Sequence, residues 1–255
     1  MSEPYRPIVV AHRGLHDALP ENSLGAFRRA GRAGVPWIEC DVWPSGDPEP
    51  LAVVLHDETL DRTTTGSGPV WSRTWEVLGS VCLRHPDGRP DAGERLPPLL
   101  DLLGAMEAGS DGPKAATPGG LPVGMLVEIK PPDSVGFVRL VVGRLRQYGG
   151  PWMAQSFDEA NLIHALAFDV GTPVAFLVEG RDALDRGIAN GWKNIHLHHH
   201  LLDEPTARRL RAAGVSVGVW TPNTADDLRG VMDLRADMII TDEPVLAMDL
   251  LRRRR

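Results

Sequence analysis

Short apolar segments alternate with longer amphipathic segments along nearly the whole chain. The short segments are typical of buried strands, and they span residues 8–11, 37–42, 125–129, 152–154, 173–178, 194–197, 215–220 and 238–241. The segments that follow them have the apolar spacing of helices, and they span residues 23–33, 99–108, 135–148, 158–168, 181–190, 204–213, 225–232 and 245–251. Strands that alternate with helices pair in parallel, so the pattern predicts an α/β protein.

The number of strand–helix units favours one closed barrel. Eight units within 255 residues match the size of a (β/α)₈ TIM barrel, and we expect residues 1–255 to form this single domain. A doubly wound open sheet is the alternative. No GxGxxG turn follows a predicted strand, so its dinucleotide-binding form has no support. Asn22 or Ser23 can cap the first helix, and Gly34 can end it.

One region interrupts the alternation. Residues 57–98 are rich in Gly, Pro, Thr, Asp and Arg, and they include Trp71 and Trp75. A structureless loop of that length is unusual in a compact domain. We therefore expect a small insertion after the second strand, at about residues 57–98. Residues 109–120 are interpreted as a plain surface loop.

The net charge limits the classes of partner. A formal charge of −7 argues against broad binding to nucleic acid or to anionic membranes, which requires a basic surface. Two cysteines without a CxxC pair argue against a disulfide framework and favour a reducing compartment. No apolar stretch approaches the roughly 18 residues of a membrane span, so we expect a soluble, cytoplasmic protein without stable membrane association. The sequence carries no clear mark of an oligomeric state.

Charged residues mark the ends of the second and third predicted strands, where barrel enzymes carry their catalytic groups. Glu39 and Asp41 are two positions apart, as are Glu128 and Lys130, so each pair shares one face of its strand. Their neighbours are apolar and suit the helix-covered outside of a barrel, which places the charged pairs inside. Three converging carboxylates repel one another unless a cation holds them. Oxygen ligands suit Mg²⁺ or Ca²⁺.

Two histidines and two cations approach the same end of the predicted barrel. His12 and Arg13 follow the first strand, and His56 follows an extended apolar segment at 51–55. A pair of imidazoles can divide general-base and general-acid duties near neutral pH, and Arg13 and Lys130 can donate to phosphate oxygens. Each residue alone could be structural. Their coincidence at successive strand ends favours metal-assisted phosphoryl transfer.

Other ring side chains leave alternatives open. The histidine cluster at 196–200 could hold a transition metal, although we favour a polar loop at the barrel mouth. Trp71, Trp75 and Trp220 could form a cage for a quaternary ammonium group. Packing within the insertion is the expected role of the first two.

Several short motifs resemble those of the glycerophosphodiester phosphodiesterase family. They are AHRG (11–14), PENS (20–23), AFRRA (26–30), IECDV (38–42), LHDETLDRTTTGSG (55–68), EIK (128–130), QSF (155–157), WTPN (220–223) and ITDEP (240–244). They stand in the family's order and span nearly the whole chain. Pro222 and the turn GDPEP at 46–50 depart from the family pattern, and they affect the fit of the substrate rather than the chemistry.

The resemblance implies a TIM barrel with an insertion after the second strand. It also implies a reaction that splits a glycerophosphodiester into glycerol 3-phosphate and an alcohol. The implied roles are a general acid–base pair at His12 and His56, a divalent metal site for Mg²⁺ or Ca²⁺ at Glu39, Asp41 and Glu128, phosphate contacts by Arg13 and Lys130, and a substrate-site lining by Asn22 and Trp220.

Two other functions remain open at the level of sequence. A lysophospholipase D or a phospholipase C-like enzyme would use the same residues on lipids, but it would need an exposed apolar rim. The many charges of the insertion favour a small-molecule glycerophosphodiester instead. A non-catalytic barrel that binds phosphate ligands would not need both histidines and all three carboxylates.

Overall fold

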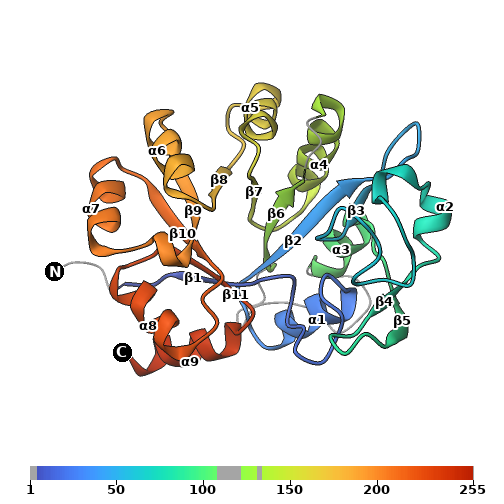
Figure 1. The fold of residues 1–255 in the computed structure, drawn as a ribbon, viewed down its shortest axis with the longest axis horizontal. Coiled ribbons are helices and arrows are strands. Elements are labelled where there is room, and N and C mark those ends of the chain that lie inside the picture. The colour runs from blue at the N-terminus through green and yellow to red at the C-terminus, as the bar shows by residue number, and fades with distance from the viewer. Residues whose placement is uncertain (1–4, 108–121, 131–133, 255) are drawn as a thin grey trace.

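The computed structural model describes residues 5–107, 122–130 and 134–254. Parallel strands form a closed barrel with helices around it (Figure 1). The barrel strands are β1 (Ile8–Ala11), β2 (Trp37–Pro44), β6 (Gly124–Ile129), β7 (Trp152–Ser156), β8 (Val174–Val178), β9 (Asn194–His198), β10 (Ser216–Trp220) and β11 (Met238–Thr241). They pair in this order, and β11 pairs with β1 to close the barrel. The predicted TIM barrel is confirmed, and the predicted loop at 109–120 lies outside the described residues.

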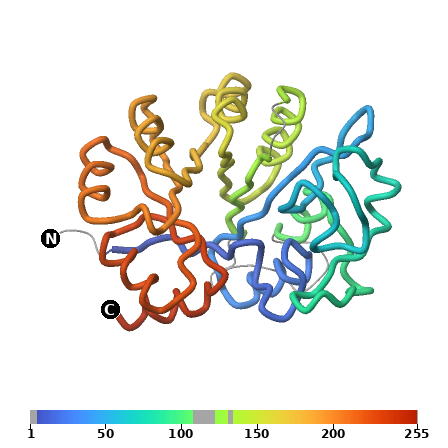
Figure 2. The backbone as a smooth tube through the Cα atoms, in the orientation of Figure 1, coloured from blue at the N-terminus to red at the C-terminus, as the bar shows by residue number. Residues whose placement is uncertain are grey.

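The chain runs from each barrel strand to a helix on the outside, and the insertion described below separates β2 from its helix. Figure 2 shows this alternating path of the backbone. The helices are α1 (Leu24–Arg32), α3 (Leu99–Met106), α4 (Val135–Gln147), α5 (Glu159–Phe168), α6 (Arg181–Ala189), α7 (Glu204–Ala212), α8 (Ala225–Asp233) and α9 (Pro244–Arg253). Of the two predicted caps for the first helix, Ser23 is the one used, since its side chain accepts from the Ala26 N–H. None of the helices in the described residues is long and apolar enough to cross a membrane.

Alternation along the strands sorts side chains between the inside and the outside of the barrel. Cys40 and Val127 are fully buried in the core between strands and helices. Glu39 and Glu128 alternate with them and point into the barrel, where their side chains are only 1% and 7% exposed. Leu126, on the same face of β6 as Glu128, packs in an inner apolar cluster. The interior therefore changes from apolar to charged toward the carboxyl ends of the strands, as the sequence predicted.

Between β2 and α3 the chain forms a small insertion, seen at the right of Figure 1. First, β3 (Ala52–Val54) pairs antiparallel with the end of β2. The insertion then contains a 3₁₀ turn η1 (Val70–Ser72), a short helix α2 (Trp75–Leu78) and the antiparallel strands β4 (Cys82–Arg84) and β5 (Pro90–Arg95). It has its own apolar cluster, against which Trp71 and Trp75 pack. The Trp71 ring centre also lies 5.4 Å from that of Trp43 in β2. Trp71 and Trp75 therefore have a packing role in the insertion, as expected from the sequence.

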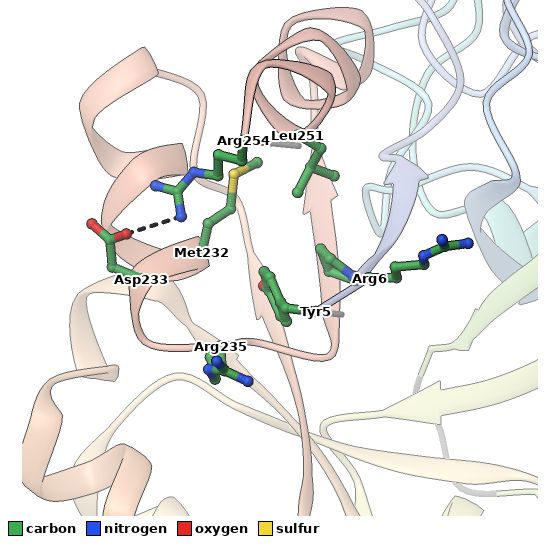
Figure 3. Close-up of a pocket in the computed structure, with 8 residues that line it drawn as sticks. Tyr5, Arg6, Met232, Asp233, Arg235, Leu251 and Arg254 are labelled. Atoms are coloured by element: carbon green, nitrogen blue, oxygen red, sulfur yellow. Dashed lines mark ion pairs between the residues drawn. The ribbon is translucent and has the colours of Figure 1, made fainter. Parts of the chain in front are cut away.

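A cavity of about 730 Å³ lies at the amino-terminal end of the barrel, beside α8 and α9 (Figure 3). The Tyr5 hydroxyl donates to the Ala236 carbonyl (2.7 Å), and Arg254 pairs with Asp233 (2.9 Å). This face of a TIM barrel usually serves stability rather than catalysis. Its described lining includes neither a histidine nor a group of carboxylates, so it lacks the groups that phosphoryl transfer needs.

Candidate active site

The turn after β1 positions Arg13 against β2. Arg13 has a left-handed backbone (φ 53°), and its N–H donates to Glu39 Oε2 (3.1 Å). Gly14 follows with φ 88°, and a Cβ at this position would lie 2.9 Å from Ala26. The turn packs directly on α1, so only glycine fits there. The HRG motif is therefore a backbone arrangement as well as a set of side chains.

Three carboxylates from two neighbouring strands converge at the carboxyl end of the barrel. One oxygen from each of Glu39, Asp41 and Glu128 lies within 4.8 Å of the others. Asp41 and Glu128 are register partners in the parallel pair β2–β6. Lys130 Nζ lies 2.9 Å from Asp41 Oδ1 and 2.7 Å from Glu128 Oε1. Arg13 Nε lies 3.4 Å from Asp41 Oδ2.

The charges of this cluster are unevenly compensated. Burial, with Asp41 and Glu128 nearby, raises the pKa of Glu39 well above its ordinary value. Burial also raises the pKa of Glu128 to about 7, against the opposing charge of Lys130. Burial would raise the pKa of Asp41 too, but Lys130 and Arg13 hold it far below its usual range. The negative charge of Asp41 is thus well compensated, whereas that of Glu39 and Glu128 is compensated only in part. A divalent ion fits this convergent, all-oxygen donor set.

Two histidines stand beside the carboxylates, and each is held by its own aspartate. His12 Nδ1 lies 2.7 Å from Asp242 Oδ1, and His56 Nδ1 lies 2.7 Å from Asp57 Oδ1. A carboxylate accepts, so Nδ1 carries the proton in both neutral rings and Nε2 keeps its lone pair. Burial lowers the pKa of both rings, and the aspartate hydrogen bonds oppose this effect. Neutral imidazoles in fixed orientations are suited to accept and return protons.

A chain of ion pairs connects the aspartate of His56 to the barrel. Arg62 donates to Asp57 through Nε (2.6 Å) and to Glu21 through Nη2 (2.8 Å). Glu21 also accepts from Arg13 Nη1 (3.0 Å). Arg62 and Glu21 lie within the sequence motifs, but they are not among the predicted site residues. In the structure they join the insertion to the first turn of the barrel.

These groups open into a cavity of about 240 Å³ at the carboxyl ends of the strands. Six of the predicted site residues line it, and they are His12, Arg13, Glu39, His56, Glu128 and Trp220. Asp41, Lys130 and Asn22 do not contribute to this lining. Asn22 is 1% exposed and donates from Nδ2 to Asp41 Oδ2 (2.9 Å). In this structure Asn22 and Lys130 therefore contact the carboxylates, and the substrate contacts expected of them stay predictions.

The cavity is also lined by residues that are not among the predicted site residues. The further lining residues are Gln155, Phe157, Leu177, Glu179 and Ile240. Gln155 donates to Glu39 Oε1 (3.3 Å), and Phe157 meets Trp220 edge-on with ring centres 5.5 Å apart. Gln155 and Phe157 belong to the QSF motif. Glu179 directly follows the last residue of β8, so the rule that barrel sites lie at strand ends could have found it.

The predicted histidine cluster divides into two parts. His196 is 3% exposed inside the barrel, and burial lowers its pKa to about 4. Its Nδ1 lies 2.8 Å from Gln155 Oε1, so it belongs to the hydrogen bonds beneath the cavity. His198, His199 and His200 lie together at the rim of the barrel. The polar loop that we favoured from the sequence describes this second part alone.

Taken with the fold, this arrangement places the chain among the TIM-barrel phosphodiesterases. The model of the glycerophosphoryl diester phosphodiesterase family matches residues 12–246, so the chain belongs to that family. The predicted resemblance is confirmed. Membership and the curated relatives support glycerophosphodiester phosphodiesterase activity.

Relatives and solved structures of the same family cover almost the whole chain. A glycerophosphodiester phosphodiesterase of Caldanaerobacter subterraneus is 27% identical over 97% of this chain and 99% of that protein. The fold is similar to that of an Oleispira antarctica phosphodiesterase solved in complex with the product sn-glycerol-3-phosphate, with a TM-score of 0.80 and 24% identity over 96% of this chain and 97% of the other. A glycerophosphodiester phosphodiesterase from Agrobacterium tumefaciens gives a TM-score of 0.72 at 24% identity over 95% and 99% of the two chains.

Proposed function

We propose that the chain hydrolyses small glycerophosphodiesters to glycerol 3-phosphate and an alcohol, with a divalent ion held by Glu39, Asp41 and Glu128. The observation that carries this proposal is the convergence of the three buried carboxylates within 4.8 Å. Their donor set suits Mg²⁺ or Ca²⁺. The bound sn-glycerol-3-phosphate of the Oleispira antarctica enzyme supports the choice of product.

His12 and His56 carry the proton transfers in this proposal. The bound ion supplies charge stabilisation to the phosphate oxygens. The glycerol 2-hydroxyl attacks phosphorus, and one histidine accepts its proton through Nε2 as the new P–O bond forms. The other histidine, in its protonated form, gives its proton to the departing alcohol oxygen as the old P–O bond breaks. Water then opens the resulting cyclic phosphate with the two histidine roles reversed, which releases glycerol 3-phosphate and restores both protonation states. Arg13, which lines the cavity, donates to a phosphate oxygen.

The direct test measures release of glycerol 3-phosphate from glycerophosphocholine and glycerophosphoethanolamine. Turnover is expected with Mg²⁺ or Ca²⁺ and should be lost in EDTA, because the carboxylates alone cannot stabilise an anionic phosphate. Lysophosphatidylcholine is assayed beside them. A strong preference for it would replace this proposal with the lysophospholipase D alternative. Binding of substrate without turnover at saturating metal would support the alternative of a non-catalytic barrel that binds phosphate ligands.

The outer wall of the cavity suits a cationic alcohol. The rings of Phe157 and Trp220 meet edge-on in the cavity lining, and Glu179 adds a carboxylate to the same lining. Aromatic faces and carboxylates together attract choline or ethanolamine groups. The Glu179→Gln variant should therefore raise KM for glycerophosphocholine by about 5-fold and leave kcat unchanged.

Glycerophosphoglycerol, which has a neutral head group, provides the matched control for that variant. Its KM should not change, because the lost charge has no cation to attract. An equal rise in KM for both substrates would show that Glu179 acts on the shape of the cavity and not on the head group.

A further inference from the structure

Three histidines at the rim of the barrel form a cluster that the proposed catalysis does not use. His198 ends β9, and His199 and His200 begin the 3₁₀ turn η2 (His199–Leu201). One ring nitrogen from each lies within 4.8 Å of the others. Ring centres are 4.8 Å apart for His198 and His199, 5.0 Å for His198 and His200, and 4.0 Å for His199 and His200. We propose that these histidines form a second metal site, for a divalent transition metal such as Zn²⁺ or Ni²⁺.

The orientation of His199 supports a ligand role. Its Nδ1 lies 3.4 Å from the Trp220 carbonyl oxygen. A carbonyl oxygen only accepts, so Nδ1 carries the hydrogen and Nε2 keeps a lone pair for a metal. Metal-bound histidines are commonly held in this way through their second nitrogen. His198 is fixed as well, because its ring meets the Trp220 indole edge-on with centres 4.9 Å apart.

The exposure of the three rings suits entry and exchange of an ion. His198 and His199 are half-buried, and His200 is exposed. Three imidazoles leave a fourth tetrahedral position for water, the usual arrangement of an open zinc site.

Ligand chemistry separates this rim site from the carboxylate site. Imidazole nitrogen favours Zn²⁺, Ni²⁺ and Cu²⁺, whereas carboxylate oxygen favours Mg²⁺ and Ca²⁺. A third group, His12, His16 and Asp242, also brings its ligand atoms within 4.8 Å of one another. There the aspartate already accepts from both histidines, with His12 Nδ1 at 2.7 Å and His16 Nε2 at 3.2 Å. Those two nitrogens are therefore already hydrogen-bonded to Asp242. The three rim histidines form the more suitable binding site for a transition metal.

Occupancy of the rim site would reach the substrate cavity through Trp220. This indole contacts His198 on one side and lines the cavity on the other. An ion that fixes the histidines would also restrain Trp220, and we expect it to slow turnover. This consequence rests on the proposed function, whereas metal binding does not.

The binding test uses Zn²⁺ calorimetry and Co²⁺ absorption, both with excess Mg²⁺ to occupy the carboxylates. Wild type is compared with His198→Ala, His200→Ala and the control His85→Ala, whose histidine pairs with Asp91 in the insertion (3.0 Å). We expect one Zn²⁺ per chain and a visible Co²⁺ band of tetrahedral type. Either rim variant should bind at least about 10-fold more weakly, and His85→Ala should bind like wild type.

The outcomes separate the proposal from its neighbours. Zn²⁺ binding that survives both rim variants overturns it, as does binding that is lost in His16→Ala instead. In the turnover assay, Zn²⁺ should inhibit wild type at the concentration at which it binds, and His200→Ala should resist. Inhibition that persists in His200→Ala would overturn the connection through Trp220. If wild type lacks turnover altogether, the proposed function fails and the binding result still decides the site.

Discussion

Replacement of His12 with alanine is expected to lower kcat for glycerophosphocholine by about 10³-fold, the usual size of a general acid or base contribution. KM should change little, because His12 takes part in proton transfer rather than in holding the substrate. The measurement is steady-state turnover at saturating Mg²⁺ or Ca²⁺, with circular dichroism to show that the barrel is intact.

His16→Ala is the matched control, because His16 contacts the same oxygen of Asp242 (3.2 Å) but does not line the cavity. Its kcat should stay close to that of wild type. Asp242→Asn should fall between the two variants and should shift the pH profile, since the His12 tautomer is then less firmly held. If His12→Ala and His16→Ala lost activity equally, His12 would have a structural role and the proposed acid–base pair would be wrong.

Asp41→Asn and Glu39→Gln should both reduce turnover by on the order of 10²-fold or more, but they should affect stability very differently. In the metal-free protein, Asp41→Asn should lower the free energy of unfolding by about 1.5–3 kcal/mol, the value of a hydrogen bond to a charged group. Lys130 and Arg13 lose a shared buried counter-charge and keep only their pairs with Glu128 and Glu21. Glu39→Gln removes a carboxylate that Asp41 and Glu128 repel. Its cost should be no more than about 1 kcal/mol, the value of a hydrogen bond.

Urea unfolding in EDTA measures this difference, and a repeat with Mg²⁺ or Ca²⁺ measures stabilisation by the ion. Wild type should gain stability from the ion, and Glu39→Gln should gain much less. Equal stabilisation of wild type and Glu39→Gln would place the ion elsewhere. Equal losses of stability in the two metal-free variants would show that Asp41 does not hold the buried cations.

Periodicity was sufficient to predict the barrel and the inward face of its strands. The apolar neighbours of Glu39 and Glu128 settle which face is outside, because helices must cover it. Carboxylates at the same height on adjacent parallel strands then have to meet, and Asp41 is indeed the register partner of Glu128. The catalytic roles of these residues and of the two histidines remain predictions that the experiments above test.

Contacts that depend on barrel closure could not be predicted from the sequence. His12 and Asp242 are 230 positions apart, and only the pairing of β1 with β11 brings them together. From the sequence, Lys130 is predicted to contact phosphate. Nothing in its spacing shows that its ammonium group reaches Asp41 and Glu128. Glu179 differs, because its place directly after a predicted strand could have identified it, although a single acid there resembles ordinary surface.

The two histidines of the proposed acid–base pair come from different parts of the fold, and ion pairs connect these parts. His12 directly follows the barrel strand β1, whereas His56 stands at the start of a segment with its own apolar cluster. The ion pair between Arg62 and Glu21 connects the two parts. The position of His56 relative to His12 therefore depends on the contacts that Arg62 makes with Asp57 and Glu21. A change in the insertion would therefore move a proposed proton carrier together with a wall of the cavity.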